Sequence, residues 1–209
     1  MRRLSKGPEP QVLVLKAEKW TVEYIDAVAD GKTPPKRWGH RDIRAALSEE
    51  TSKRCAYCDS TMAAVTAAQV EHILPRSSRP DLVVVWMNLT LACPRCNRFK
   101  SDYYETSLPL VNPYVDDPST HLLFFGNLVF PVPGNDRGKV TVLRLGLHRS
   151  DLAEARGRRL EVVSRLLDEW ARASGPVREA LEHLIREDAD SGEYATSVFA
   201  YLRSVGFPT

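Results

Sequence analysis

Four cysteines stand in the sequence as two Cys-x-x-Cys pairs, Cys55 with Cys58 and Cys93 with Cys96. Each pair presents two thiolates from one tight turn, and four thiolates complete a closed tetrahedral shell around Zn²⁺. Two disulfides and two redox-active motifs are the alternatives, but a redox motif normally stands alone at the start of a helix. Here the pairs are duplicated and flank a further motif, which favours zinc. Because a closed shell leaves no coordination position for water, we predict a structural zinc ion.

A second group of reactive side chains lies within and just after the segment that the two pairs enclose. It comprises Glu71 and His72, then Asn88, then Asn97 directly after Cys96. In this order the residues resemble the HNH nuclease motif, which implies a β-hairpin and a helix that together hold one divalent metal ion. The resemblance also implies that Asn88 orients the loop and the histidine. The wider superfamily often has Asp at the first position and His at the last, so Glu71 and Asn97 are variants.

The chemistry of phosphodiester hydrolysis gives each of these residues a role. The reaction needs a nucleophile derived from water and a cation that stabilises charge on the phosphate. A neutral imidazole can take a proton from water near physiological pH, so His72 is the predicted general base. Glu71 and Asn97 carry the oxygen donors that Mg²⁺ and Mn²⁺ prefer, so they are the predicted ligands of the catalytic metal. With Asn88, these residues form the predicted catalytic site.

Basic side chains crowd the same stretch of sequence, although few acidic residues accompany them. Five of them are predicted to contact phosphates of the substrate, namely Arg76, Arg79, Arg95, Arg98 and Lys100. A solvated surface charge is the alternative for each one taken singly. As a group they favour a nucleic-acid substrate, and we expect DNA.

The composition is that of an ordinary globular protein. The 209 residues are 43% hydrophobic and 27% charged, and the net charge of +2 is too small to indicate nucleic-acid binding by itself. No apolar run approaches the roughly 18 residues that cross a bilayer, and the start of the chain lacks the apolar core of a signal peptide. We therefore expect no membrane association and a cytoplasmic location.

Hydrophobic periodicity predicts the elements that position the site. Residues 12–29 and 40–53 are expected to form helices before the first cysteine pair. After Pro113, three apolar runs separated by Gly-Asn pairs predict a small antiparallel sheet, over residues 121–125, 128–132 and 140–145. A helical stripe begins near Asp151 and a second one follows Pro176.

These elements predict an α+β fold with a ββα-metal (HNH) core, a structural four-cysteine zinc site, a small antiparallel sheet and flanking helices. The predicted organisation is a helical N-terminal lobe over residues 1–53 and a zinc-bound nuclease core over residues 54–112. Residues 113–209 then form a small sheet and a helical C-terminal lobe.

A closer resemblance extends beyond the catalytic motif. The opening Lys6-Gly7-Pro8-Glu9-Pro10 with Leu13, the Cys-Ala-Tyr-Cys and Glu-His-Ile segments, Asn112-Pro113 and Asp117-Pro118 are similar to the PtuB-like proteins. These are HNH effectors of Septu and retron-linked anti-phage systems. The resemblance runs from Lys6 to Pro118 and implies an ATPase partner that restrains or licenses cleavage.

Two other functions compete with this interpretation. A zinc ribbon that binds nucleic acid, or serves as an adaptor, explains the four cysteines but leaves His72 and Asn97 without a role. Alternatively, the nuclease chemistry serves restriction, a mobile element or a toxin instead of a defence complex.

Overall fold

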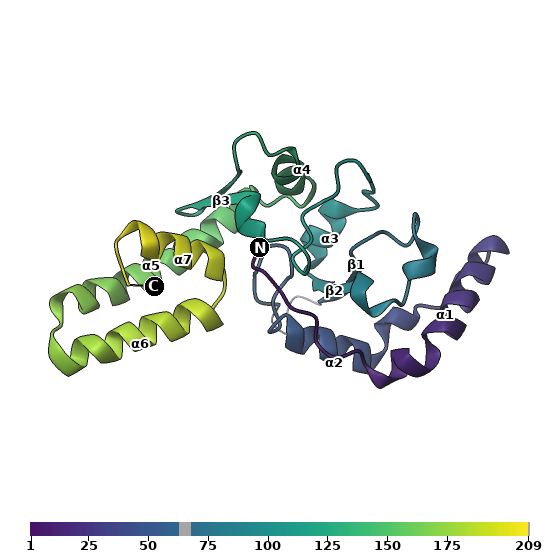
Figure 1. Ribbon diagram of the computed structural model, residues 1–209, viewed down its shortest axis with the longest axis horizontal. Coiled ribbons are helices and arrows are strands. Elements are labelled where there is room, and N and C mark those ends of the chain that lie inside the picture. Colours follow the sequence, from purple (N-terminus) through teal and green to yellow (C-terminus); the bar gives the residue numbers. More distant parts are fainter. Residues whose placement is uncertain (63–67, 209) are drawn as a thin grey trace.

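The computed structural model of the chain describes residues 1–62 and 68–208 (Figure 1). Its elements, in chain order, are α1 (Gln11–Ala29), η1 (Arg37–Gly39), α2 (Arg41–Glu50), β1 (Gln69–His72), η2 (Pro80–Leu82), η3 (Trp86–Asn88), β2 (Leu89–Ala92), α3 (Pro94–Lys100), η4 (Pro118–Thr120), β3 (Leu122–Phe125), β4 (Leu128–Pro131), α4 (Asp136–Arg144), α5 (Ser150–Arg172), α6 (Gly175–Ser191) and α7 (Ala195–Ser204). The α+β fold class predicted from the sequence is confirmed.

The two helices expected before the first cysteine pair are present as α1 and α2. Helix α2 begins after His40, whose ring accepts a hydrogen bond from the backbone N–H of Asp42 and so satisfies one free amide of the first turn. Its residues Ile43 and Leu47 lie one turn apart, and both are fully buried. In α1, the buried residues Leu13 and Tyr24 also lie on one face. The apolar spacing read from the sequence therefore identified the correct packing face of α2, whereas for α1 the sequence predicted only the helix itself.

Strands β1 and β2 and helix α3 form the predicted ββα unit. The strands pair in antiparallel register, with Glu71 opposite Thr90 and His72 opposite Leu89. Helix α3 begins at Pro94, directly after Cys93, and Pro is favoured in a first turn because its missing N–H has no partner there. It packs against β1. A single short unit therefore carries the carboxylate–histidine pair, a cysteine pair and the distal asparagine.

The sheet predicted after Pro113 is partly wrong. Strands β3 and β4 form the expected hairpin, with Leu122 opposite Pro131. The third run, residues 140–145, lies instead in helix α4 and the turn that follows it. The buried residues there have helical spacing, and the side chain of Asn135 caps the helix by accepting a hydrogen bond from the N–H of Gly138. The capping residue and this spacing were the sequence signals for a helix.

The C-terminal part is the helical hairpin of α5 and α6 with α7 packed across it (Figure 1). The helices bury one cluster of their own, which includes Val163, Ile185 and Leu202. The two predicted helical stripes correspond to α5 and α6, and Pro176 lies in the first turn of α6. Within the described residues, no helix is both long and apolar enough to span a bilayer.

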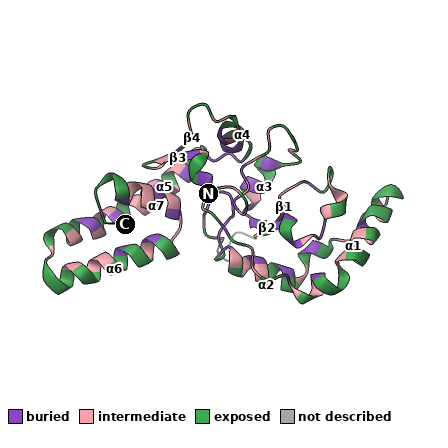
Figure 2. Cartoon of the chain, in the orientation of Figure 1, coloured by how far each residue is buried: buried purple, intermediate pink, exposed green. Residues whose placement is uncertain are grey.

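Two further clusters of buried side chains include residues of the ββα unit. Figure 2 marks the buried positions along the chain in purple. One joins α1 and α2 to β2 and the loop before it, through residues such as Trp20, Leu47 and Leu89. The other joins the cysteines to Met1 and to the β3–β4 hairpin. The first cluster crosses the predicted limit at residue 53, and the second crosses the limits at residues 53 and 112, so the three-part division of the chain stays a prediction. The ββα unit is held from both sides.

Candidate functional site

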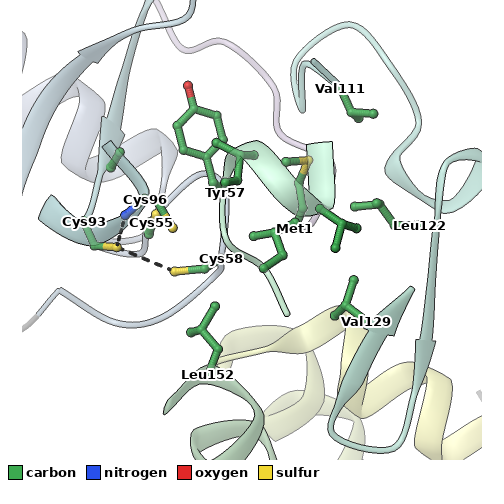
Figure 3. Close-up of a cluster of buried hydrophobic side chains, with 14 of the residues drawn as sticks. Met1, Cys55, Tyr57, Cys58, Cys93, Cys96, Val111, Leu122, Val129 and Leu152 are labelled. Carbon is green, nitrogen blue, oxygen red and sulfur yellow. Dashed lines mark hydrogen bonds between the residues drawn. The ribbon is translucent and has the colours of Figure 1, made fainter. Parts of the chain in front are cut away.

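The four cysteines converge on one buried point. Their Sγ atoms all lie within 4.8 Å of one another, and Figure 3 shows them beside Met1 and Leu152. A tetrahedral zinc shell with Zn–S bonds of about 2.3 Å places the sulfurs about 3.8 Å apart, and the Sγ atoms of Cys58 and Cys93 are 3.9 Å apart. The donor set and its spacing therefore fit the predicted structural zinc ion, and neither pair forms a disulfide.

The environment of the cysteines favours the thiolate at Cys58 and Cys93, whereas burial raises the pKa of Cys55 and the pKa of Cys96 is raised as well. Hydrogen bonds from the Cys55 thiol and the other sulfurs lower the pKa of Cys58, and the pKa of Cys93 falls to about 7 for the same first cause. The guanidinium of Arg149 also points at the cluster, with its Nη1 atom 3.5 Å from the Sγ of Cys96. Positive charge at this distance offsets part of the negative charge that four thiolates bring around one divalent ion.

Strand β1 and helix α3 bring the predicted catalytic residues to one pocket. This pocket of about 380 Å³ is lined by Glu71 and His72 from β1 and by Asn97 and Lys100 from α3. We call it the HNH pocket. Asn88 does not line it. The sequence separates Glu71 from Asn97 by a long segment, and the antiparallel hairpin followed at once by the helix closes that separation.

His72 is held by its Nε2 atom and lies in an apolar setting. Nε2 is 2.8 Å from the carbonyl oxygen of Val83, and the ring meets the indole of Trp38 edge-on, with 5.1 Å between ring centroids. Since a carbonyl oxygen can only accept, Nε2 carries the proton in the neutral ring and Nδ1 keeps a free lone pair. Burial lowers the pKa of His72 to about 4, so the ring is neutral at physiological pH. A neutral, oriented imidazole can accept a proton from water.

Glu71 forms a buried ion pair with Lys100. The Nζ atom of Lys100 is 2.8 Å from the Oε1 atom of Glu71 and also donates to the carbonyl oxygen of His72 at 2.8 Å. Desolvation raises the pKa of Glu71, while the lysine acts in the opposite direction. Lys100 was predicted to contact substrate phosphate, but its side chain is only 2% exposed and its charge faces Glu71. Its position differs from that of an exposed phosphate ligand.

The two asparagines use their amides differently. Asn97 donates from Nδ2 to the Oε1 atom of Gln69 at 2.7 Å, which orients its Oδ1 acceptor. Asn88 is buried and ties the ends of the loop between β1 and β2 together. Its Oδ1 accepts from the N–H of Leu74 at 2.8 Å, and its Nδ2 donates to the carbonyl oxygens of Leu74 and Leu82. These contacts fit a residue that orients the loop.

The predicted basic residues do not form one group. Arg79 binds Asp81 through two hydrogen bonds, at 2.9 and 2.6 Å, and Arg95 pairs with Asp151 at 2.5 Å. Arg76 lines the HNH pocket with its guanidinium carbon 4.9 Å from the centroid of the Trp38 ring. Arg98 is exposed on α3.

Several residues of the site were missed from the sequence. Asp102 lines the HNH pocket and adds a carboxylate to it. Lys36 and Arg44 line an adjoining hollow of about 470 Å³ that shares Arg76 and Asn97 with the HNH pocket. Asp102 follows the motif directly and was open to prediction. The two cations lie far from it in sequence, so no spacing signalled them.

The fold and the site together define the class of protein to which the chain belongs. Residues 55–102, which span both cysteine pairs and the ββα unit, match the family model described as HNH endonuclease. The chain is thus an HNH-type nuclease with a four-cysteine metal site.

Two relatives narrow this class. The chain is 31% identical over 219 aligned residues to the Septu protein PtuB of Bacillus thuringiensis, an alignment that covers 97% of this chain and 82% of that protein. It is 26% identical over 160 residues to the Septu protein PtuB of Bacillus mycoides (strain KBAB4), covering 62% of this chain and 54% of that relative. The chain belongs to the PtuB family. The predicted resemblance is confirmed, and it extends beyond Pro118 into the C-terminal helices.

Proposed function

We propose that this protein is a metal-dependent endonuclease of Septu antiviral defence, that its substrate is DNA, and that it cleaves at the HNH pocket. The observation that carries the proposal is the shared lining of that pocket. A buried imidazole, its Nε2 fixed by the carbonyl oxygen of Val83, borders the same space as the oxygen donors of Glu71 and Asn97. A zinc ribbon that only binds nucleic acid has no need of this arrangement.

In this proposal Glu71 and Asn97 hold the catalytic cation, for which Mg²⁺ and Mn²⁺ are the expected choices. Both side chains offer hard oxygen donors. The Nδ2 atom of Asn97 donates a hydrogen bond to Gln69, which leaves the Oδ1 atom of Asn97 as the acceptor that can bind a cation. Asp102 is a third oxygen donor on the pocket wall. When bound, such a cation stabilises the negative charge that develops on the phosphate and leaving oxygen.

His72 then acts as the general base through Nδ1. The hydrogen bond from Nε2 to Val83 fixes the tautomer, so the nitrogen that accepts the proton from water is defined before substrate binds. Packing against Trp38 restricts the ring, which limits the reorganisation that proton transfer requires. Arg76 stands at the pocket edge, where its guanidinium can bind the phosphate next to the scissile bond.

Lys100 balances the charge of Glu71 in this scheme. A buried carboxylate without a partner is costly, and the lysine 2.8 Å away offsets that cost when no cation is bound. The zinc ion has a different task. It joins the turn at Cys55–Cys58 to the start of α3, and so fixes the helix that carries Asn97 against the hairpin that carries His72.

An ATPase partner completes the proposal, because the family resemblance implies one and an unrestrained nuclease would cleave the host genome. The test is a cleavage assay of the full chain, with and without a co-purified ATPase partner, on plasmid, linear DNA and RNA in Mg²⁺. Wild-type protein should cut DNA. His72→Ala should lose a factor of about 10²–10⁴ in rate, the usual contribution of a general base, and should keep its affinity for DNA. Equal cleavage by both proteins would refute the proposal.

A further inference from the structure

A second and larger pocket shares Lys100 as a lining residue with the HNH pocket. It has a volume of about 520 Å³, within the range of roughly 300–1,000 Å³ typical of small-molecule sites. Its walls come from the loop between β1 and β2, which supplies Leu74, and from the segment after α3, which supplies Tyr104, Leu110 and Val115. Most of its lining is apolar or aromatic. We call it the tyrosine pocket.

One side chain that lines the tyrosine pocket carries a polar atom without a partner. Tyr57 lines it and is 2% exposed, yet its hydroxyl has no hydrogen-bond partner among residues 1–62 and 68–208. Figure 3 shows its ring directed away from the sulfur atoms of Cys55 and Cys58. An unpaired buried hydroxyl costs free energy comparable to a lost hydrogen bond, so each one in a native structure needs an explanation, and a bound polar group is one. The zinc-binding turn itself holds this hydroxyl in place.

The pocket is coupled by position to the proposed cleavage site. Lys100 lines both the tyrosine pocket and the HNH pocket. The loop that Asn88 fixes also serves both, because Leu74 lines one and Pro75 lines the other. The two pockets therefore share a wall at Lys100, which places a ligand group in the tyrosine pocket next to the site where the substrate strand is proposed to be cut.

We propose that the tyrosine pocket binds an unpaired base of the substrate strand next to the scissile phosphate. This inference rests on the proposed nuclease function. A nucleobase is flat and largely apolar on its faces, which suits the aromatic and aliphatic walls, and its edge carries carbonyl or ring-nitrogen acceptors for the Tyr57 hydroxyl. A paired base cannot leave the stack without cost, so the pocket selects single-stranded or locally opened nucleic acid.

The experiment combines an abasic scan of the substrate with two pocket variants of the full-length protein. Val115→Trp fills the pocket from an exposed position, since Val115 is 69% exposed. Val177→Trp, at a position 62% exposed on α6, is the matched control. Tyr57→Phe removes only the hydroxyl. Affinity for a single-stranded oligonucleotide is measured in the His72→Ala background, so that the reading does not depend on turnover.

With the pocket residues unchanged, the protein should lose about tenfold in affinity for the oligonucleotide when the abasic nucleotide stands at one particular position. This is the order of effect of losing one stacked base. Val115→Trp should show a similar loss with the intact strand and no further loss at that position, whereas Val177→Trp should behave as wild type. Tyr57→Phe should lose less than Val115→Trp, because the walls remain.

A flat abasic scan, or equal affinities of the two tryptophan variants, would overturn the inference. It would also be overturned if Val115→Trp kept its affinity for the oligonucleotide and lost the ATPase, because the pocket would then dock a protein. If affinity follows the expected pattern but wild-type protein cleaves nothing, the base pocket stands and the proposed nuclease function fails. The two failures are thus distinguishable.

Discussion

The Nζ atom of Lys100 lies 2.8 Å from the Oε1 atom of Glu71, and the two side chains are 2% and 7% exposed. The ammonium group of Lys100 therefore supplies a positive charge next to a carboxylate of the HNH pocket. Removing one partner from a buried ion pair leaves an unpaired charge, which is far more costly than replacing both. If Glu71 is a ligand of the catalytic cation, as proposed, this pair links the stability of the protein to cation binding.

We expect Lys100→Met to lower the free energy of unfolding by about 3–5 kcal/mol, because Glu71 stays buried without its partner. The double variant with Glu71→Gln should recover most of that loss. Urea unfolding with and without Mg²⁺ measures both. If Glu71 is a metal ligand, Mg²⁺ should stabilise Lys100→Met more than wild type, since only the variant lacks a cation at that carboxylate. Equal stabilisation of the two proteins would count against Glu71 as a ligand.

From the four clustered cysteines we predict one tightly bound zinc ion per chain. Structural zinc contributes roughly 10–16 kcal/mol of binding free energy in small zinc domains, so its loss should unfold the region around the ββα unit. Metal analysis and thermal unfolding before and after chelation should show a large fall in the melting temperature that Zn²⁺ reverses and Mg²⁺ does not. Cys93→Ser should lose the metal. A Cys93→Ser variant with full zinc content and unchanged melting would contradict the assignment.

Asn88 is predicted to stabilise the loop between β1 and β2 without touching the reacting atoms. Asn88→Ala removes three hydrogen bonds and leaves the partly buried N–H and carbonyl groups of Leu74 without partners, so it should cost about 3 kcal/mol. Met87→Ala, at the neighbouring position that is 57% exposed, is the control and should change stability little. Hydrogen exchange should show faster exchange of the Leu74 amide in Asn88→Ala. Unchanged exchange of the Leu74 amide would argue against this role of Asn88.

Asn97 should affect the concentration of Mg²⁺ that cleavage requires. Asn97→Ala removes an oxygen donor from the HNH pocket, so half-maximal cleavage should need at least about tenfold more Mg²⁺, with partial recovery of the rate at saturation. Arg98→Ala, the exposed neighbour on α3, should leave the Mg²⁺ dependence unchanged while weakening DNA binding in low salt. If Arg98→Ala raised the Mg²⁺ requirement and Asn97→Ala only weakened DNA binding, Asn97 would not be a metal ligand.

The sequence alone determined the features that depend on residue type and short spacing. Two Cys-x-x-Cys turns define a four-sulfur site wherever they meet, because zinc imposes its own geometry on them. The order of Glu71, His72, Asn88 and Asn97 indicated the nuclease motif, and helical periodicity located the buried face of α2. The strand predicted over residues 140–145 is wrong because a short apolar run is compatible with either a strand or a buried helix. Asn135, which caps helix α4, is the residue that distinguishes the two.

Only the tertiary structure decided which atoms share a pocket. The acceptor that fixes His72 is the backbone carbonyl of Val83, and no side-chain pattern marks a carbonyl group. Lys100 reads as one more surface cation until α3 packs on β1 and buries it beside Glu71. The hydroxyl of Tyr57 likewise becomes an unpaired donor only when its surroundings close. Burial and distance change what a charge or hydroxyl can do, and both arise between segments that are remote in the chain.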